Sequence, residues 1–199
     1  MRSLPVRLAA VVAVVAAVLA ASAGALILVP AADASGPVVS VDDFAFTPAA
    51  VAVGQGGSIT WQFHSSHTST SDQGFWDSGS RSSGSFVVTF HDAGAFAYHC
   101  AMHPFMTGSV RVPLAASGRP AAGYRVRWSL RGSTPGNRRF DVQYRRVGTS
   151  AWNWFRRVSA TRSGLFDPMA VGTYQVRART RNVGVGVSGW SPVLSLRIR

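Results

Sequence analysis

The chain has 199 residues, enough for one large domain or two small ones, and its net charge of +12 comes from Arg and Asp alone, because it contains no Lys and no Glu. The single cysteine, Cys100, excludes an internal disulfide. The sequence contains no nucleophile-elbow, phosphate-loop, dinucleotide or zinc-protease motif, and no general acid–base pair stands out. We therefore expect a protein that is not an enzyme.

The first 34 residues indicate export. Arg2 and Arg7 precede an apolar stretch from Leu8 to Val29, and small residues around Asp33 follow it. A basic start, an apolar stretch and an A-x-A end are typical of a secretory signal peptide, although ~20 apolar residues can also span a bilayer. Residues 1–34 are therefore expected to be a signal peptide or an N-terminal membrane anchor, and the protein to be secreted or held at the cell envelope.

Residues 38–113 alternate apolar and polar side chains in several short stretches, among them 59–63, 86–90 and 96–100. This alternation, broken by Gly and Asp turns, predicts a small antiparallel β-sandwich. Aromatic residues mark the inner face of the stretch 96–100, so Cys100 is expected to point inward and His99 outward. A tight loop is expected at Ala101–Thr107.

Soft metal-ligating side chains crowd around Cys100. A thiol, an imidazole and a thioether follow one another at Cys100, His103 and Met106, and this donor set suits copper better than zinc, which rarely takes Met. A further ligand must come from elsewhere, and His64 and His67 follow the stretch around Trp61. The competing interpretation is that Cys100 is a buried thiol of the core.

Residues 43–112 resemble the cupredoxins, the small blue copper proteins. The matching runs are "FTPAAVAVGQGGSITW", "GFWDSG" and "SFVVTFHDAGAFAYHCAMHPFMTGSVRV", and the Cys-x-x-His-x-x-Met spacing is that of amicyanin-like members. The resemblance implies a Greek-key cupredoxin β-sandwich over residues 38–113 that holds one copper ion, cycling between Cu(I) and Cu(II). The ligands it implies are His67 (with His64 as the alternative), Cys100, His103 and, as the weak axial ligand, Met106.

The resemblance also gives roles to residues around this site. His103 is expected to be the port for electrons. Packing from Phe63, Phe96 and Phe105 is expected to keep the site dry, with Phe105 alternatively part of an apolar docking rim. An asparagine that ties the two ligand loops together in the family is missing here, and Ser65 or Ser66 is the expected replacement.

Residues 114–199 differ sharply in charge from the preceding region. Residues 38–113 carry two Arg against five Asp, a net charge of −3, whereas 114–199 carry sixteen Arg against two Asp, a net charge of +14. Pro, Gly, Ala and Ser dominate around residues 114–122, which predicts a linker. Alternating stretches over 123–199 predict a second β-sandwich. Its expected inner residues are Trp128, Phe140, Val142, Tyr144, Tyr174, Val176 and Ala178.

The region 123–199 resembles a fibronectin type III domain, which implies an immunoglobulin-like β-sandwich. Trp128 matches the buried tryptophan of an early strand, Tyr174 matches the corner tyrosine, and "SGWSP" matches the segment before the last strand. The whole chain is thus expected to be all-β.

Three arginines of this region, Arg177, Arg179 and Arg181, alternate with inner residues and should share an outer face, where Trp190 could stack on them. Their side chains either cover apolar surface or form a face that binds an anionic cell-envelope polymer or an acidic partner. No nucleic-acid motif is present, so no specific nucleic-acid partner is expected.

Together these patterns favour an exported one-electron carrier that exchanges electrons with a redox partner protein. One alternative is a protein that stores copper or delivers it to an acceptor. The other is a surface-binding or adhesion protein that acts through its arginine-rich region. Membrane contact is expected only through the N-terminal segment.

Overall fold

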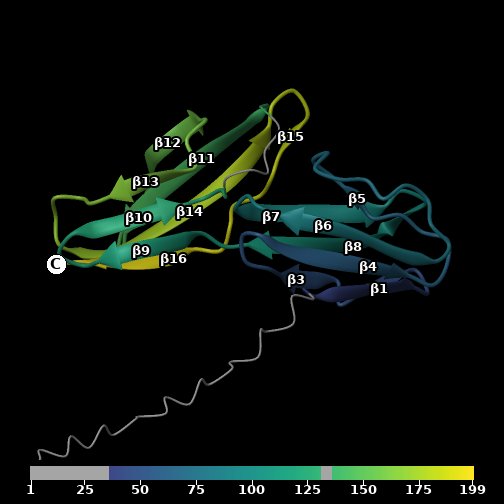
Figure 1. The fold of residues 1–199 in the computed structure, drawn as a ribbon. Helices are drawn as coiled ribbons and strands as arrows, with labels where there is room; N and C mark the ends of the chain where they lie inside the picture. Colours follow the sequence, from purple (N-terminus) through teal and green to yellow (C-terminus); the bar gives the residue numbers. More distant parts are fainter. Residues whose placement is uncertain (1–35, 131–135) are drawn as a thin grey trace, which may run out of the picture. The chain divides into compact units, whose positions relative to one another are not determined.

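The computed structural model describes residues 36–130 and 136–199, which are drawn in colour in Figure 1. The elements in these ranges are all β-strands, which confirms the predicted all-β class. The predicted signal peptide or anchor, residues 1–34, lies outside the described residues. Within those residues no helix has the length and apolar character needed to cross a membrane.

Two four-stranded sheets form the first half of the described chain. Their strand orders are β2-β1-β4-β6 and β3-β8-β7-β5. The β-sandwich prediction is confirmed, and most strand pairs are antiparallel as expected, but the β1–β4 and β3–β8 pairs are parallel, so the sheets are mixed. The bounds are β1 (Val38–Asp42), β2 (Ala45–Thr47), β3 (Ala50–Ala52), β4 (Gly57–Phe63), β5 (Thr70–Ser71), β6 (Gly84–Phe90), β7 (Gly94–Cys100) and β8 (His103–Val112).

The core of this first sandwich follows the alternation of the sequence. On β7 the side chains of Phe96, Tyr98 and Cys100 are buried while His99 is half-exposed, as predicted. Trp61 of β4 is fully buried, and its ring centroid lies 5.4 Å from that of Tyr98. The hydrophobic core therefore extends along β7 to the thiol at its end.

The β7–β8 hairpin is tighter than the sequence indicated. The loop expected at Ala101–Thr107 is reduced to two residues, because β8 already begins at His103 and pairs there with Cys100. The next pair, His99 with Thr107, leaves residues 104–106 without partners on β7. Residues 104–106 therefore form an irregular segment near the start of β8, and regular pairing with β7 resumes at Thr107.

Two further sheets form the second half, with orders β13-β10-β9 and β12-β11-β14-β15, and β16 also pairs with β14. The predicted inner residues are buried here, with Tyr144 only partly so. Assignment to the fibronectin type III class stays a prediction. The bounds are β9 (Ala115–Arg119), β10 (Gly123–Arg127), β11 (Arg138–Arg146), β12 (Asn153–Ser159), β13 (Ser163–Phe166), β14 (Gly172–Asn182), β15 (Gly186–Val187) and β16 (Leu194–Ile198).

The segment 114–122, expected to be a linker, instead contains strand β9. Leu114 is buried in the second core, and residues 115–119 pair antiparallel with β10. Alanine and glycine have a low propensity for β-strands, which is why the sequence did not indicate one here. A strand forms nevertheless, because β10 supplies hydrogen-bond partners for the backbone groups of this segment.

Both cores belong to one compact unit. Backbone hydrogen bonds join Ala95 to Gly189 in both directions, and the Thr180 hydroxyl donates to the carbonyl of Ala93 at 2.8 Å. The division of the chain into separate domains stays a prediction.

We predict that Gly108→Ala destabilises the first sandwich by about 1–3 kcal/mol, because a methyl group there would overlap the ring of Tyr98. That ring is fully buried and cannot move aside, and burial also raises the pKa of Tyr98 to about 12. Urea denaturation followed by tryptophan fluorescence measures the loss. Gly54→Ala, where the added carbon meets open space, is the control, and an equal loss in both variants would contradict the argument.

Candidate metal centre

The centre begins with the hairpin that pairs Cys100 and His103. Cys100 ends β7 on its buried face and has no exposed surface. His103 begins β8 as its cross-strand partner, and directly opposite residues present their side chains on the same face of a sheet. The two-residue turn therefore places a thiol and an imidazole side by side.

His67 reaches the same place from the other end of the sequence. It follows β4 and exchanges two backbone hydrogen bonds with Arg81, of 3.0 and 2.9 Å, which fix the loop on both sides. Its side chain is only 3% exposed, whereas His64 is exposed on the same loop. The structure thus brings His67 to Cys100 and His103, and His64 lies outside this group.

Three donor atoms converge here. The Nδ1 atoms of His67 and His103 lie 3.1 Å apart, and each lies 3.6 Å from Sγ of Cys100. The point equidistant from the corners of this triangle is about 2.0 Å from each atom, close to the ~2.0–2.3 Å of metal bonds to imidazole nitrogen and thiolate sulfur. The residues present therefore fit one metal ion.

The electrostatics favour the ligating form of His67. Burial lowers the pKa of its imidazole, and the neighbouring His103 lowers it further. Asp42 acts in the opposite direction but does not reverse the shift. His67 is therefore neutral at neutral pH, which leaves a ring nitrogen free to bind a metal.

Thr68 ties the two ligand loops together, a role that the sequence patterns did not reveal. Its backbone N–H donates to Sγ of Cys100 at 3.3 Å, and its hydroxyl accepts the N–H of Ala101 at 2.7 Å. Ser65, one of the expected replacements for the missing asparagine, instead donates to Asp42 at 2.8 Å. The signal that could have found Thr68 is its place directly after His67, with a side chain able to accept a hydrogen bond.

Met106, the predicted axial ligand, lies on β8 and is 2% exposed within the same hydrophobic cluster as Cys100.

The three phenylalanines expected to keep the site dry differ in their burial. Phe105 is 73% exposed, which contradicts its expected part in dry packing, whereas Phe63 and Phe96 are buried as expected. The unpaired residues 104–106 explain this difference, because they leave the sheet and return with Met106 facing inward.

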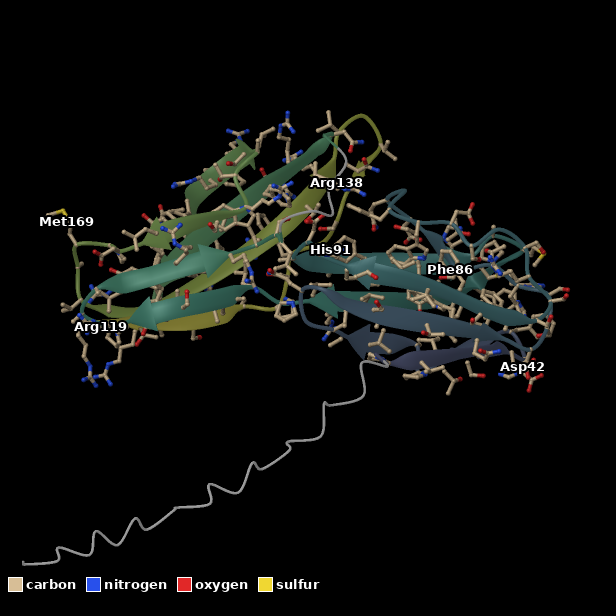
Figure 2. All side chains as sticks on the ribbon, viewed as in Figure 1. Asp42, Phe86, His91, Arg119, Arg138 and Met169 are labelled. Carbon is tan, nitrogen blue, oxygen red and sulfur yellow. The ribbon has the colours of Figure 1, made fainter. Side chains whose placement is uncertain are left out.

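Phe44 is a second residue at the site that the sequence did not reveal. It lies in the turn between β1 and β2, and Asp43 and Phe44 both have positive φ, of 46° and 59°. Its ring stands edge-on to His103, with centroids 4.8 Å apart, and to His67 at 5.8 Å. Such turns favour Asn, Asp and Gly, so a phenylalanine in the second position did not indicate a tight turn that would bring its ring to the site. Together with Asp42, which marks this end of the sandwich in Figure 2, Phe44 borders a shallow hollow beside His67 and His103.

The second group of predicted site residues lies on β14 and is already engaged within the protein. The guanidinium of Arg177 lies between two indole rings, 4.0 Å from the centroid of Trp152 and 4.4 Å from that of Trp190, and donates twice to Gln143. Arg179 also stacks on Trp190, at 4.6 Å. The predicted stacking on Trp190 is therefore present, and anion binding by these arginines stays a prediction.

Asp141 forms ion pairs with two arginines of this group, Arg179 and Arg181. Its side chain is fully buried on β11, and its Oδ2 accepts from Nε of Arg179 at 2.8 Å and from Nε of Arg181 at 2.9 Å. Its Oδ1 accepts the N–H of Val158 at 2.9 Å, where φ is +48°, a rare value for a β-branched residue. Burial alone would raise the pKa of Asp141, but these hydrogen bonds outweigh it and lower the pKa.

Comparisons with known proteins find solved structures that are similar to part of this chain. No protein-family model and no curated protein matches the sequence. The chain is similar to a reduced tryptophan-to-tyrosine variant of amicyanin, with 25% identity over 42% of this chain and 86% of that one and a TM-score of 0.37. It is also similar to the Cu(I) form of a methionine-to-alanine variant of amicyanin, with 26% identity, the same two coverages and a TM-score of 0.37. An oxidised methionine-to-leucine variant matches at 25% identity over 38% and 80%, with a TM-score of 0.35.

We predict that Thr68→Val destabilises the metal-free protein by about 1–3 kcal/mol, because the N–H of Ala101 loses its acceptor while the volume of the side chain is kept. Thr68→Ser retains the hydroxyl and should recover most of the loss. Urea denaturation of both variants measures it. Equal stability of the Val variant and the wild type would show that the hydroxyl does not tie the loops.

We predict that Asp141→Asn lowers the free energy of unfolding by about 2–4 kcal/mol at pH 7, because two guanidiniums lose their counter-charge. The pKa of Asp141 is lower in the folded protein, so its contribution is complete above its unfolded pKa of ~4 and is lost as the pH falls through the folded value. Unfolding measured from pH 7 down to pH 3 should therefore show the gap between wild type and variant narrowing. A gap that is constant with pH would contradict the assignment.

Proposed function

We propose that this protein binds one copper ion through His67, Cys100 and His103 and carries single electrons. The observation that carries the proposal is the convergence of one buried sulfur and two imidazole nitrogens around a point about 2.0 Å from each. The donor set supports copper in particular, because a thiolate with two imidazoles suits an ion that changes between Cu(I) and Cu(II).

Bound copper would supply a centre that accepts and releases one electron. The residues of the chain would keep the surroundings of that centre the same in both of its charge states. Cys100 has no exposed surface and belongs to an aromatic core, so water is excluded from the sulfur. The N–H of Thr68 donates to this sulfur and would stabilise its negative charge. The backbone bonds between His67 and Arg81 hold the second imidazole in place whichever charge the site carries.

Met106 is proposed as the weak axial ligand. Its support is its burial in the same hydrophobic cluster as Cys100 and its position three residues after His103. A thioether at this place would tune the potential rather than determine whether copper binds.

His103 is proposed as the route by which electrons enter and leave. Its side chain is half-buried, and the exposed rings of Phe44 and Phe105 lie 4.8 and 6.0 Å from its ring. An apolar rim of this kind would let a redox partner protein approach the imidazole without trapped water. We also propose, from residues 1–34, that the protein works outside the cytoplasmic membrane.

We expect the purified full chain to show an intense visible thiolate-to-copper band after addition of Cu(II), and to lose it in Cys100→Ser. His67→Ala should abolish the band, and His64→Ala, which removes an exposed side chain of the same loop, should retain it. A colourless protein that binds Zn²⁺ as tightly as Cu(II) would overturn the proposal. Repeated reduction and reoxidation with copper retained distinguishes a carrier from a protein that delivers copper to an acceptor.

A further inference from the structure

We infer that the outer face of the three-stranded sheet β13-β10-β9 is a binding surface for an anionic polysaccharide, independent of the copper site. This "arginine face" is defined by Arg119 of β9, Arg125 and Arg127 of β10 and Arg162 beside β13. Arg177, Arg179 and Arg181, which the sequence singled out, lie on another sheet and are already bonded within the protein.

The register of the sheet puts the side chains of Arg119, Arg125 and Arg127 on one side, and Arg162 lines a hollow next to Arg127. Arg125 pairs with Ser117 and with Leu165, and Arg127 pairs with Ala115 and Ser163, so the residues of both rows share a face. Val126, between the two arginines, is fully buried and points into the core. Arg119 is exposed two positions beyond Ser117 on the same strand face, and Figure 2, where it is labelled, shows nitrogen-bearing side chains projecting beside it.

Three of these arginines lack a carboxylate partner, in contrast to Arg179 and Arg181 of β14. In the described part of the chain, no carboxylate forms an ion pair with Arg119, Arg125 or Arg127, whereas Asp141 pairs with both Arg179 and Arg181. Arg162 differs from these three, because burial raises the pKa of Asp92 and the charge of Arg162 is among the groups that oppose this rise. A row of unpaired guanidiniums attracts anions and can grip carboxylate or sulfate groups with two hydrogen bonds each.

The surface between the arginines is shaped for an extended ligand. Two adjoining shallow hollows, of about 190 and 480 Å³, both reach Arg127 and Ser163. Their walls carry the small side chains of Ala115 and Ala116 and the hydroxyls of Ser117, Ser163 and Thr161. Shallow hollows that run into one another suit a polymer lying along the sheet better than an enclosed small molecule.

The chemistry of the lining favours sugar over nucleic acid. Hydroxyl groups can exchange hydrogen bonds with the hydroxyls of sugar rings. No aromatic ring lines either hollow among the residues described, and unstacked bases are normally held on such rings. The ligand class that fits both the charge and the hydroxyls is a polysaccharide bearing carboxylate or sulfate groups.

Part of the face is also held in position before any ligand arrives. Nε of Arg127 donates to Oε1 of Gln55 at 3.0 Å, and Nε2 of Gln55 donates to the carbonyls of Arg127 and Pro113 at 3.0 and 3.1 Å. An arginine that is already oriented loses less conformational freedom on binding.

The test uses the full chain and two probes, heparin for sulfate groups and polygalacturonate for carboxylate groups, with affinities measured by calorimetry. We expect at least one probe to bind, and the double variant Arg125→Gln/Arg127→Gln to weaken it by about tenfold or more. The matched control, Arg111→Gln/Arg157→Gln, removes two exposed arginines elsewhere and the same net charge. Its affinity should stay within about twofold of the wild type.

Each other outcome overturns the inference. Equal losses in the two double variants would mean that only the overall positive charge attracts the probe. Absence of binding to both probes would show that the arginine face is not a binding surface for anionic polysaccharides. Tighter binding of a single-stranded DNA oligomer through the same arginines would assign the face to nucleic acid. The Cu(II) band and the unfolding midpoint, expected to be unchanged in both variants, verify that the protein is folded, and the proposed copper site stands or falls separately.

Discussion

The position of Cys100 is the constraint on which the rest of the metal centre depends. The residue ends a strand whose inward side chains belong to the aromatic core, and its own side chain is fully buried in that core, which restricts the movement of its sulfur. The turn after it returns His103, and Thr68 attaches the distant loop through one bond to the sulfur and one to the next backbone N–H. A rigid sulfur thus orders two loops that have few regular hydrogen bonds of their own.

The chain uses one kind of cation for two physical purposes. Where arginines meet indole rings, as Arg177 does, or a buried carboxylate, as Arg179 does, they pack within the sheet of strands β11 and β14. Where no acid faces them, as at Arg125, the same side chain leaves its charge to solvent. Planar guanidinium serves both purposes because it stacks on rings and binds anions, which an ammonium group does less well.

Local patterns predicted the parts of the site that depend on neighbouring residues in sequence. Alternation was enough to orient Cys100 and His99, since side-chain direction along a strand is a local property. The choice of His67 over His64 depends on backbone bonds to Arg81, and these follow from how a long loop folds back. The position of Phe44 depends on a turn without Gly or Asn, and strand β9 on a partner strand, so neither had a clear local signal.

Strand β9 is the last strand of its sheet, and its outward edge offers unpaired backbone groups to any other strand. A second copy of this chain approaching edge to edge would bring the arginines of the two sheets near one another, Arg119 of β9 and Arg125 and Arg127 of β10. Such an approach meets electrostatic repulsion before any hydrogen bond can form. The positive charge on this sheet therefore also protects the protein from growing into aggregates by strand addition, and neutralising it would remove that protection.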